Sequence, residues 1–436
     1  MSITEQQVSR LDFNSTKFDS TMERCFGEHI VAKAKQLKQS VVFQEKFARN
    51  FNEVDTVADA LAAKMKADPN TARDYSLAVK AGISAVDNPS SELVSFIESA
   101  ENIPAFIDRD KVDLGGRVFQ TKLDIPGLML YGFPVSIYNQ AFIPSITLAL
   151  LFSMQPKGDP ATIIQALATK SNTFRGSVRL LETFKWFGKV SDQGAGQLYS
   201  APYLESCRIR LVHAHIRSAI NAHKNDWNFS PSITWRTQEL GMPLCAADGS
   251  IVVSSVVAAI YSMRRHLKKN ISRQELDALN HWSNYVSYLQ GVPEDLLFPT
   301  AEDTVAYFAA FMMSINVETY HHELASFVES FQNLHMEKAM FRKSKSMQFV
   351  LSGLIEAIID ETFSDDVKSF YRINKAPLWA KSLLRTTKAG IAGVNLVSGK
   401  SKYINQKLED GSILLWKELI PEAEKVFGKR FGSVVS

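Results

Sequence analysis

Apolar residues recur every three or four positions along most of the chain, which is the spacing of one face of an α-helix. Runs that alternate apolar and polar residues, as strands do, are nearly absent. Gly and Pro number only 21 and 15 among 436 residues, so the chain encodes few turns and favours long helices. The sequence therefore predicts an all-α protein with helices within 22–66, 174–190, 207–224, 254–269, 272–291 and 301–331, and three or four more within 345–435.

Local signals mark some of the helix boundaries. Ser272 and Glu275 have the spacing of a capping box and predict the start of one helix. Ser90 or Ser91 predicts the N-cap of another. The segment 67–74, ADPNTARD, predicts a turn.

Glycines and the chain ends bear on domain organisation. Residues 102–119 predict an extended segment, a turn and a helix that Gly115–Gly116 interrupts, and Gly and Ser predict breaks around 389–401. No internal repeat or low-complexity linker divides the chain. We therefore expect a single large helical domain at 21–436, preceded by a loose N-terminal arm at 1–20.

Composition excludes several classes of function. The net charge of +3 is spread along the chain and no RNA- or DNA-binding signature occurs, so nucleic acid is not an expected partner. The three cysteines, an odd and sparse set, fit a reducing compartment, and the absence of a CxxC motif excludes a zinc ribbon. The N-terminal sequence has no basic region followed by an apolar run, so we expect no signal peptide and a cytoplasmic protein.

Residues 125–155 contain no charge and raise the question of a membrane span. Pro126, Pro134 and Pro144 break this stretch, and its longest unbroken apolar piece, 145–154, is too short to cross a bilayer. We therefore expect buried helices that line the core or a ligand pocket.

The predicted helix at 207–222, CRIRLVHAHIRSAINA, carries more charge than buried helices usually do. A helical projection puts His213 about 40° from the centre of the apolar face, with Arg210 and Arg217 beside it and His215 nearly opposite. One interpretation is a core histidine bonded to a carbonyl, with the arginines in structural ion pairs. The other is a planar dianionic ligand such as haem, whose metal His213 coordinates and whose carboxylates the arginines hold. A strand with an HxH metal site is disfavoured by the alanines and the helical period.

The helix at 178–190 is apolar on most sides except for one stripe. Arg179, Glu182, Thr183 and Trp186 fall at spacings that place them on this stripe. The stripe is either a buried structural Arg–Glu pair or the polar wall of a ligand pocket.

Motifs of other kinds of catalytic or metal site are incomplete or absent. Glu318-x-x-His321 has the spacing of carboxylate di-iron helices, but the chain has no second such motif, so a di-iron site is not expected. Serine-hydrolase elbows, Walker loops, GxGxxG turns and HExxH are absent.

Five stretches, in order along the chain, resemble one protein family. RLVHAHIR at 210–217 is similar to the Arg-x-x-His-Ala-x-x-Arg helix of the latex-clearing-protein and mpaB-type oxygenases, and RLLETF at 179–184 to their Arg-Leu-x-x-Thr helix. The other three stretches are 99–119, 241–248 and 281–303. The resemblance spans residues 20–310 and is strongest at 174–303, which leaves 310–436 as additional packing helices.

The resemblance implies an all-helical fold with a globin-like core that binds haem b, and an activity that cleaves olefinic double bonds of isoprenoid chains with dioxygen. By position, His213 would be the axial iron ligand. Arg210 and Arg217 would hold the haem propionates or support the histidine. Arg179 and Thr183 would belong to the distal helix.

Glu182 departs from the family pattern, because rubber-cleaving members have lysine at this position; a glutamate changes the charge and ligation of the distal side. Those members are also secreted, so a polymer outside the cell is not the expected substrate. We expect a haem b-dependent oxygenase, cytoplasmic with a peripheral membrane contact, that acts with dioxygen on a hydrophobic isoprenoid or lipid-like molecule. The alternatives are a haem-binding sensor, carrier or storage protein without turnover, and a metal-free helical scaffold.

Overall fold

The protein is helical throughout the part of the chain that the computed structural model describes, apart from turns and an isolated antiparallel bridge between Leu11 and Ile315. This confirms the all-α prediction. The predictions for 1–10, 125–155, Arg179, Glu182 and 317–331 lie outside the described residues. The described residues are 11–123, 183–223, 241–266, 269–316, 344–370, 373–398, 402–414 and 416–417.

The helices follow one another in three groups along the chain. The first group is α1 (Asp19–Phe26), α2 (Glu28–Gln39), α3 (Val41–Asn50), α4 (Thr56–Ala67), α5 (Asn70–Ala81), α6 (Ser91–Glu101) and α7 (Arg109–Lys122). The second is the helical segment 183–190, α13 (Ala201–His223), α15 (Ala246–His266), α16 (Arg273–Leu289) and α17 (Ala301–Ser314). The third is α20 (Lys345–Thr362), α21 (Asp365–Phe370), α22 (Leu378–Ser398) and α23 (Lys402–Leu414).

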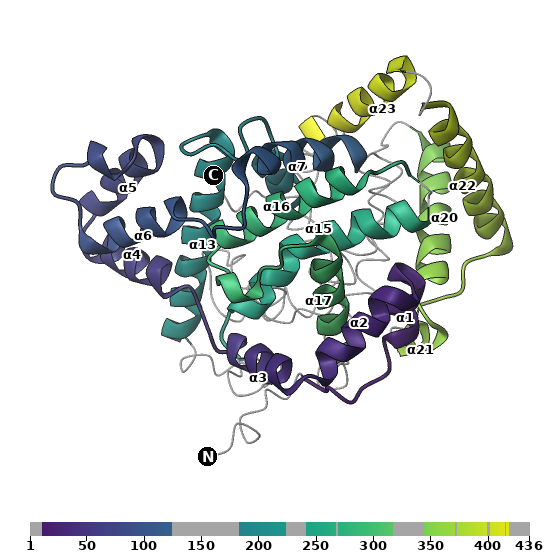
Figure 1. The fold of residues 1–436 in the computed structure, drawn as a ribbon, viewed down its shortest axis with the longest axis horizontal. Helices are drawn as coiled ribbons and strands as arrows, with labels where there is room; N and C mark the ends of the chain where they lie inside the picture. Colours follow the sequence, from purple (N-terminus) through teal and green to yellow (C-terminus); the bar gives the residue numbers. More distant parts are fainter. Residues whose placement is uncertain are drawn as a thin grey trace.

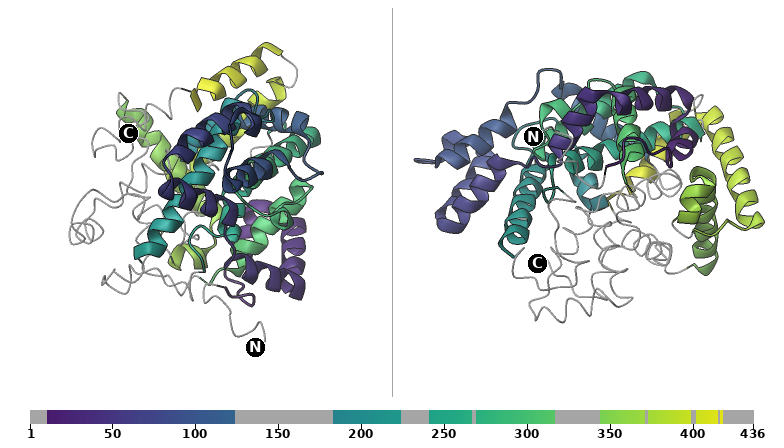
Figure 2. Two further views of the ribbon diagram at one scale, coloured as in Figure 1. Left: turned by 90° about the vertical axis from the view of Figure 1, so that its left-hand side faces the viewer. Right: turned by 90° about the horizontal axis from the view of Figure 1, so that it is seen from below.

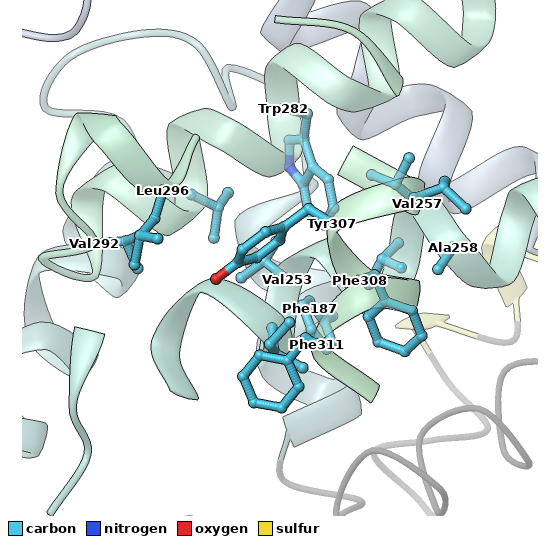
Figure 3. Close-up of a cluster of buried hydrophobic side chains, with 14 of the residues drawn as sticks. Phe187, Val253, Val257, Ala258, Trp282, Val292, Leu296, Tyr307, Phe308 and Phe311 are labelled. Carbon is cyan, nitrogen blue, oxygen red and sulfur yellow. The ribbon is translucent and has the colours of Figure 1, made fainter. Parts of the chain in front are cut away.

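Three helices of the second group, α15, α16 and α17, form the centre of the molecule (Figure 1). α7 covers α16, and α2 covers α17. Figure 3 shows Val257 of α15, Trp282 of α16 and Tyr307 of α17 among the buried side chains of this core. By length and composition α15 could cross a membrane, but 83% of its most apolar window is buried inside the structure, as in the core helix of a globular protein.

The other helices lie around this centre. α4, α5 and α6 lie at one end of the molecule and α20, α21 and α22 at the opposite end (Figures 1 and 2). α13 packs along α4, so the helix that carries the candidate histidine adjoins the N-terminal helices.

Gly115 and Gly116, where the sequence predicted an interruption, lie where α7 packs closely against α16 and residue Ser191. That prediction is wrong, because α7 continues through both residues. A Cβ at Gly115 would lie 2.1 Å from the carbonyl oxygen of Ala278 on α16, and a Cβ at Gly116 would lie 2.7 Å from that of Ser191. The glycines therefore let neighbouring backbones approach, at a helix-propensity cost of about 1 kcal/mol each.

Two other predicted breaks are wrong in position. α5 begins at Asn70, inside the predicted turn at 67–74, because Pro69 already has helical backbone angles of φ −60° and ψ −23°. α22 runs through Gly390 and Gly393, although a break was predicted from 389. A helix tolerates isolated glycines when its other residues favour it.

The predicted helix starts are confirmed. Ser272 and Glu275 make both hydrogen bonds of a capping box at the start of α16. Ser90, one of the two predicted N-caps, accepts a hydrogen bond from the backbone N–H of Leu93 at 3.3 Å.

The described part of the predicted N-terminal arm packs against the domain. Leu11 is buried, and the backbone N–H of Asp12 donates to the carbonyl of Ser314 at 2.8 Å. Phe18 is fully buried immediately before α1. Residues 11–18 are therefore held on the helical core, at the end of α17.

Candidate functional site

The segment with the two histidines is helical, which removes the alternative of an HxH metal strand. Within α13, His213 is half-buried, whereas His215 is exposed on a different face. Leu211 and Ala214 are buried beside them. The structure thus separates the two histidines as the helical projection predicted.

Arg210 lies one turn before His213 and is buried in a hydrogen-bonded ion pair. Its Nε and Nη2 donate to the two carboxylate oxygens of Asp55 at 2.5 and 3.0 Å. Its Nη1 donates to Ser99 Oγ on α6 at 2.9 Å, and the guanidinium lies 4.7 Å from the centre of the Phe96 ring. The Arg210 guanidinium is therefore bound by carboxylate, hydroxyl and aromatic face together.

Arg217 lies one turn after His213 and makes a second pair of the same kind. Its Nε donates to both carboxylate oxygens of Asp59 at 2.9 and 3.2 Å, and its Nη2 lies 2.7 Å from Asp59 Oδ1. Longer hydrogen bonds of 3.4 Å reach the backbone carbonyls of Leu244 and Asp55. Arg217 is 3% exposed, so its guanidinium, like that of Arg210, is buried and bonded to protein groups.

Asp55 and Asp59 belong to the start of α4 and stand four residues apart on one side of it. Asp55 is the N-cap and accepts from the backbone N–H of Ala58 at 3.1 Å. Burial by itself raises the pKa of Asp55, but the hydrogen bonds and charge of Arg210 hold it below its ordinary value. Asp55 is therefore a carboxylate at neutral pH.

A glycine next to this carboxylate leaves space for it. Gly291 has a φ of +83°, which side chains rarely adopt, and a Cβ there would lie 2.2 Å from Asp55 Oδ2. Asp55 and Asp59 are not among the site residues that the sequence predicted. The local sequence around Asp55 could indicate only that it is the N-cap of a helix. That signal does not predict an ion pair with an arginine 155 positions away.

His213 is held as a neutral imidazole. Burial lowers its pKa to about 4, and the charge of Arg217 adds to this effect while Asp55 opposes it. Among the described residues, none forms a hydrogen bond with the His213 ring. A neutral imidazole whose nitrogen is not engaged by protein is the form that ligates a metal.

The described residues around His213 do not form a set of protein ligands that could hold a metal by themselves. In the described parts of the chain, no three His, Cys, Asp or Glu side chains group as a metal site. A haem iron fits better, because the porphyrin supplies four nitrogens and the protein needs to supply only an axial ligand. The neutral ring of His213 suits that single role.

The helix at 183–190 reaches the first half of α13. Lys189 pairs with Glu205 at 3.1 Å, and Trp186 and Phe187 are buried against the core. Thr183 is half-buried at the first described position of this helix. Arg179 and Glu182 lie outside the described residues, so the roles given to Arg179, Glu182 and Thr183 stay predictions.

The fold and the site together define an all-α protein with one candidate ligand histidine flanked by buried arginines. A family model for the catalytic domain of the "ER-bound oxygenase mpaB/B'/Rubber oxygenase" matches residues 121–389. The chain belongs to this family of oxygenases, because the match covers more than half of its length. This confirms the family resemblance.

A solved structure shares the fold of this chain. The structure titled "Structure of Latex Clearing Protein LCP in the closed state" superposes with a TM-score of 0.52 and covers 88% of this chain and 92% of that chain. Its sequence identity is 15%, so the likeness shows a shared helical fold. A search of curated proteins gives no match. Asp55 and Asp59 precede the part of the chain that the family model matches.

Proposed function

We propose that this protein is a haem b-dependent oxygenase that acts with dioxygen on a hydrophobic isoprenoid or lipid-like substrate, in the cytoplasm. Membership of the oxygenase family supports the reaction class. The observation that carries haem dependence is the neutral His213 on the motif helix, with no hydrogen bond to its ring among the described residues.

The roles of this chain's residues follow from that position. His213 would hold the iron, and a bound haem would supply the centre at which dioxygen is activated. Arg210 and Arg217 would keep the helix turns on either side of His213 in place. Arg179, Glu182 and Thr183 would line the opposite side, where their polar groups would orient dioxygen and the substrate.

Absorption spectra test the haem assignment. The full chain, expressed with haem supplementation, should show a Soret band in the ferric and ferrous states. His213→Ala should lose this band, and His215→Ala, on another face of the same helix, should keep it. A colourless wild type would overturn haem binding, and an unchanged spectrum in His213→Ala would overturn the ligand assignment.

Turnover separates the oxygenase from a haem-binding sensor, carrier or storage protein. Ferrous protein in an oxygen-electrode cell should consume dioxygen when an unsaturated isoprenoid lipid is added, and yield carbonyl products. The same protein with a saturated lipid of equal length is the control. Haem binding without lipid-dependent oxygen consumption would favour the non-catalytic alternative.

We propose in addition that the C-terminal helices make a peripheral contact with anionic membrane. Phe349 of α20 and Trp379 of α22 stack at 4.4 Å while 61% and 41% exposed, and neighbouring Leu378 is 83% exposed. Residues 367–408 contain nine Lys and Arg and no Asp or Glu. Lys368, Lys381 and Lys388 pair with carboxylates of residues 360–365, and the other six Lys and Arg leave this segment with an excess of positive charge. Exposed aromatic and apolar side chains beside this excess suit an anionic lipid surface.

Vesicle co-sedimentation tests this contact. The protein should bind phosphatidylserine-containing vesicles better than neutral phosphatidylcholine vesicles, and Leu378→Ser with Trp379→Ser should weaken the binding. Val41 and Val42 of α3 are 65% and 74% exposed, so serine at these positions is a matched control. Equal binding by both double variants would overturn the location of the contact.

A further inference from the structure

The two arginines beside His213 are both anchored to one short stretch of the N-terminal helices, at the start of α4. We infer that Asp55 and Asp59 are positioning residues, which fix the orientation of the α13 turns that present His213. The inference rests on the proposed function, because it concerns the geometry of the haem ligand. Neither carboxylate lies in the part of the chain that the family model matches.

The spacing on α13 makes this anchoring specific. Arg210 lies three residues before His213 and Arg217 four residues after it, so all three share one face of the helix. The two anchor points are separated by about 10 Å along the helix axis. Two separated points fix both the rotation and the tilt of a helix, whereas one point would leave it free to pivot.

The burial of these pairs also points to a role in geometry. The side chains of Arg210 and Asp55 are 5% and 6% exposed, and in the second pair Arg217 is 4% exposed while Asp59 is 34% exposed. A buried ion pair contributes little net stability, because desolvation of the two charges offsets their attraction. What it does provide is a defined arrangement, since a bidentate pair is satisfied in one relative orientation.

The contacts of each guanidinium extend this arrangement to other segments. Arg210 reaches Ser99 on α6, and Arg217 reaches the Leu244 carbonyl just before α15. The donors of Arg210 at Nε, Nη1 and Nη2 are all engaged by protein acceptors. The geometry therefore favours support of the histidine over capture of haem propionates.

The test uses conservative substitutions in the full chain. Asp59→Asn and Arg217→Lys each break the bidentate pair, and Asp59 is 34% exposed in its side chain, so folding should survive. We expect haem transfer to excess apomyoglobin to accelerate about ten- to a hundredfold, as for other residues that orient a metal ligand. The ferric absorption spectrum should change with it.

Matched variants separate positioning from a general loss of stability. Asp68→Asn alters an exposed ion pair at the C-terminal end of α4, with Lys64 at 3.8 Å, and should leave haem transfer unchanged. Combining Asp59→Asn with Arg217→Lys should have no more effect than either alone, because both remove one interaction. Asp59→Glu, which keeps the carboxylate, should recover part of the wild-type spectrum.

The outcomes distinguish failure of the proposed function from failure of this inference alone. If the wild type binds no haem, the proposed function fails and this inference fails with it. If the wild type binds haem and Asp59→Asn and Arg217→Lys match its spectrum and transfer rate, the inference alone is overturned. The same conclusion follows if Asp68→Asn changes haem transfer as much as Asp59→Asn does.

Discussion

The substitution Gly115→Ala measures how closely α7 approaches α16. Helix propensity alone predicts a gain of about 0.5–1 kcal/mol, because alanine loses less backbone entropy than glycine. The structure predicts the opposite sign. The new Cβ would lie 2.1 Å from the Ala278 carbonyl oxygen and 2.6 Å from Trp282 Cβ, so the backbone of α16 has to move. Overpacking of this kind costs about 1–3 kcal/mol, which exceeds the propensity gain.

Urea unfolding, followed by circular dichroism and tryptophan fluorescence, gives the sign. The Gly115→Ala midpoint should fall, with the slope unchanged. Gly390→Ala and Gly393→Ala in α22 are controls, because nothing lies within 4 Å of a Cβ built at either position. These two variants should be more stable by about 0.5–1 kcal/mol. A Gly115→Ala protein as stable as the controls would refute the close approach of α7 and α16.

Two further predictions concern buried polar groups of α16. His281 accepts a hydrogen bond at Nδ1 from the backbone N–H of Asp108 at 3.2 Å, and burial lowers its pKa. Stability should therefore be full above about pH 6.5 and decline below it, because the unfolded chain takes up the proton first. His281→Gln should flatten this decline in acid titrations of the unfolding midpoint, and an unchanged acid slope would contradict the role. Thr304→Val should cost about 1–3 kcal/mol by urea unfolding, because Asn280 Oδ1 loses its buried 2.6 Å donor. Thr304→Ser should retain most of the stability, and a neutral Thr304→Val would show that this hydrogen bond is dispensable.

The sequence predicted helices well where the signal was local. Apolar periodicity follows directly from burial of one helix face, and Ser272 with Glu275 caps α16 through atoms three residues apart. The projection of α13 likewise separated His213 from His215, because their angular separation is a property of the helix itself. These features required no knowledge of what packs against the helix.

The error at Gly115–Gly116 and the omission of Asp55 and Asp59 involve partners distant in the sequence. Gly115 has the same local signature whether it ends a helix or lets α16 approach, and only the position of Ala278 decides. Asp55 looks like an ordinary N-cap until Arg210 is placed beside it. The projection of the helix left haem as one of two interpretations, and family resemblance favoured it; the distal-side roles came from the resemblance.

Two properties of a ligand histidine, its protonation state and its orientation, depend on different parts of this chain. Each arginine beside His213 is paired with one carboxylate, and among these four groups the charge of Arg217 lowers the pKa of the ring while that of Asp55 raises it. Burial is the main cause of the lowered pKa of His213, and the neutral ring follows from the packing of α13. The ion pairs to α4 therefore act on the orientation of the His213 ring. Loss of Asp59 should therefore disturb how the ring points more than whether it carries a proton.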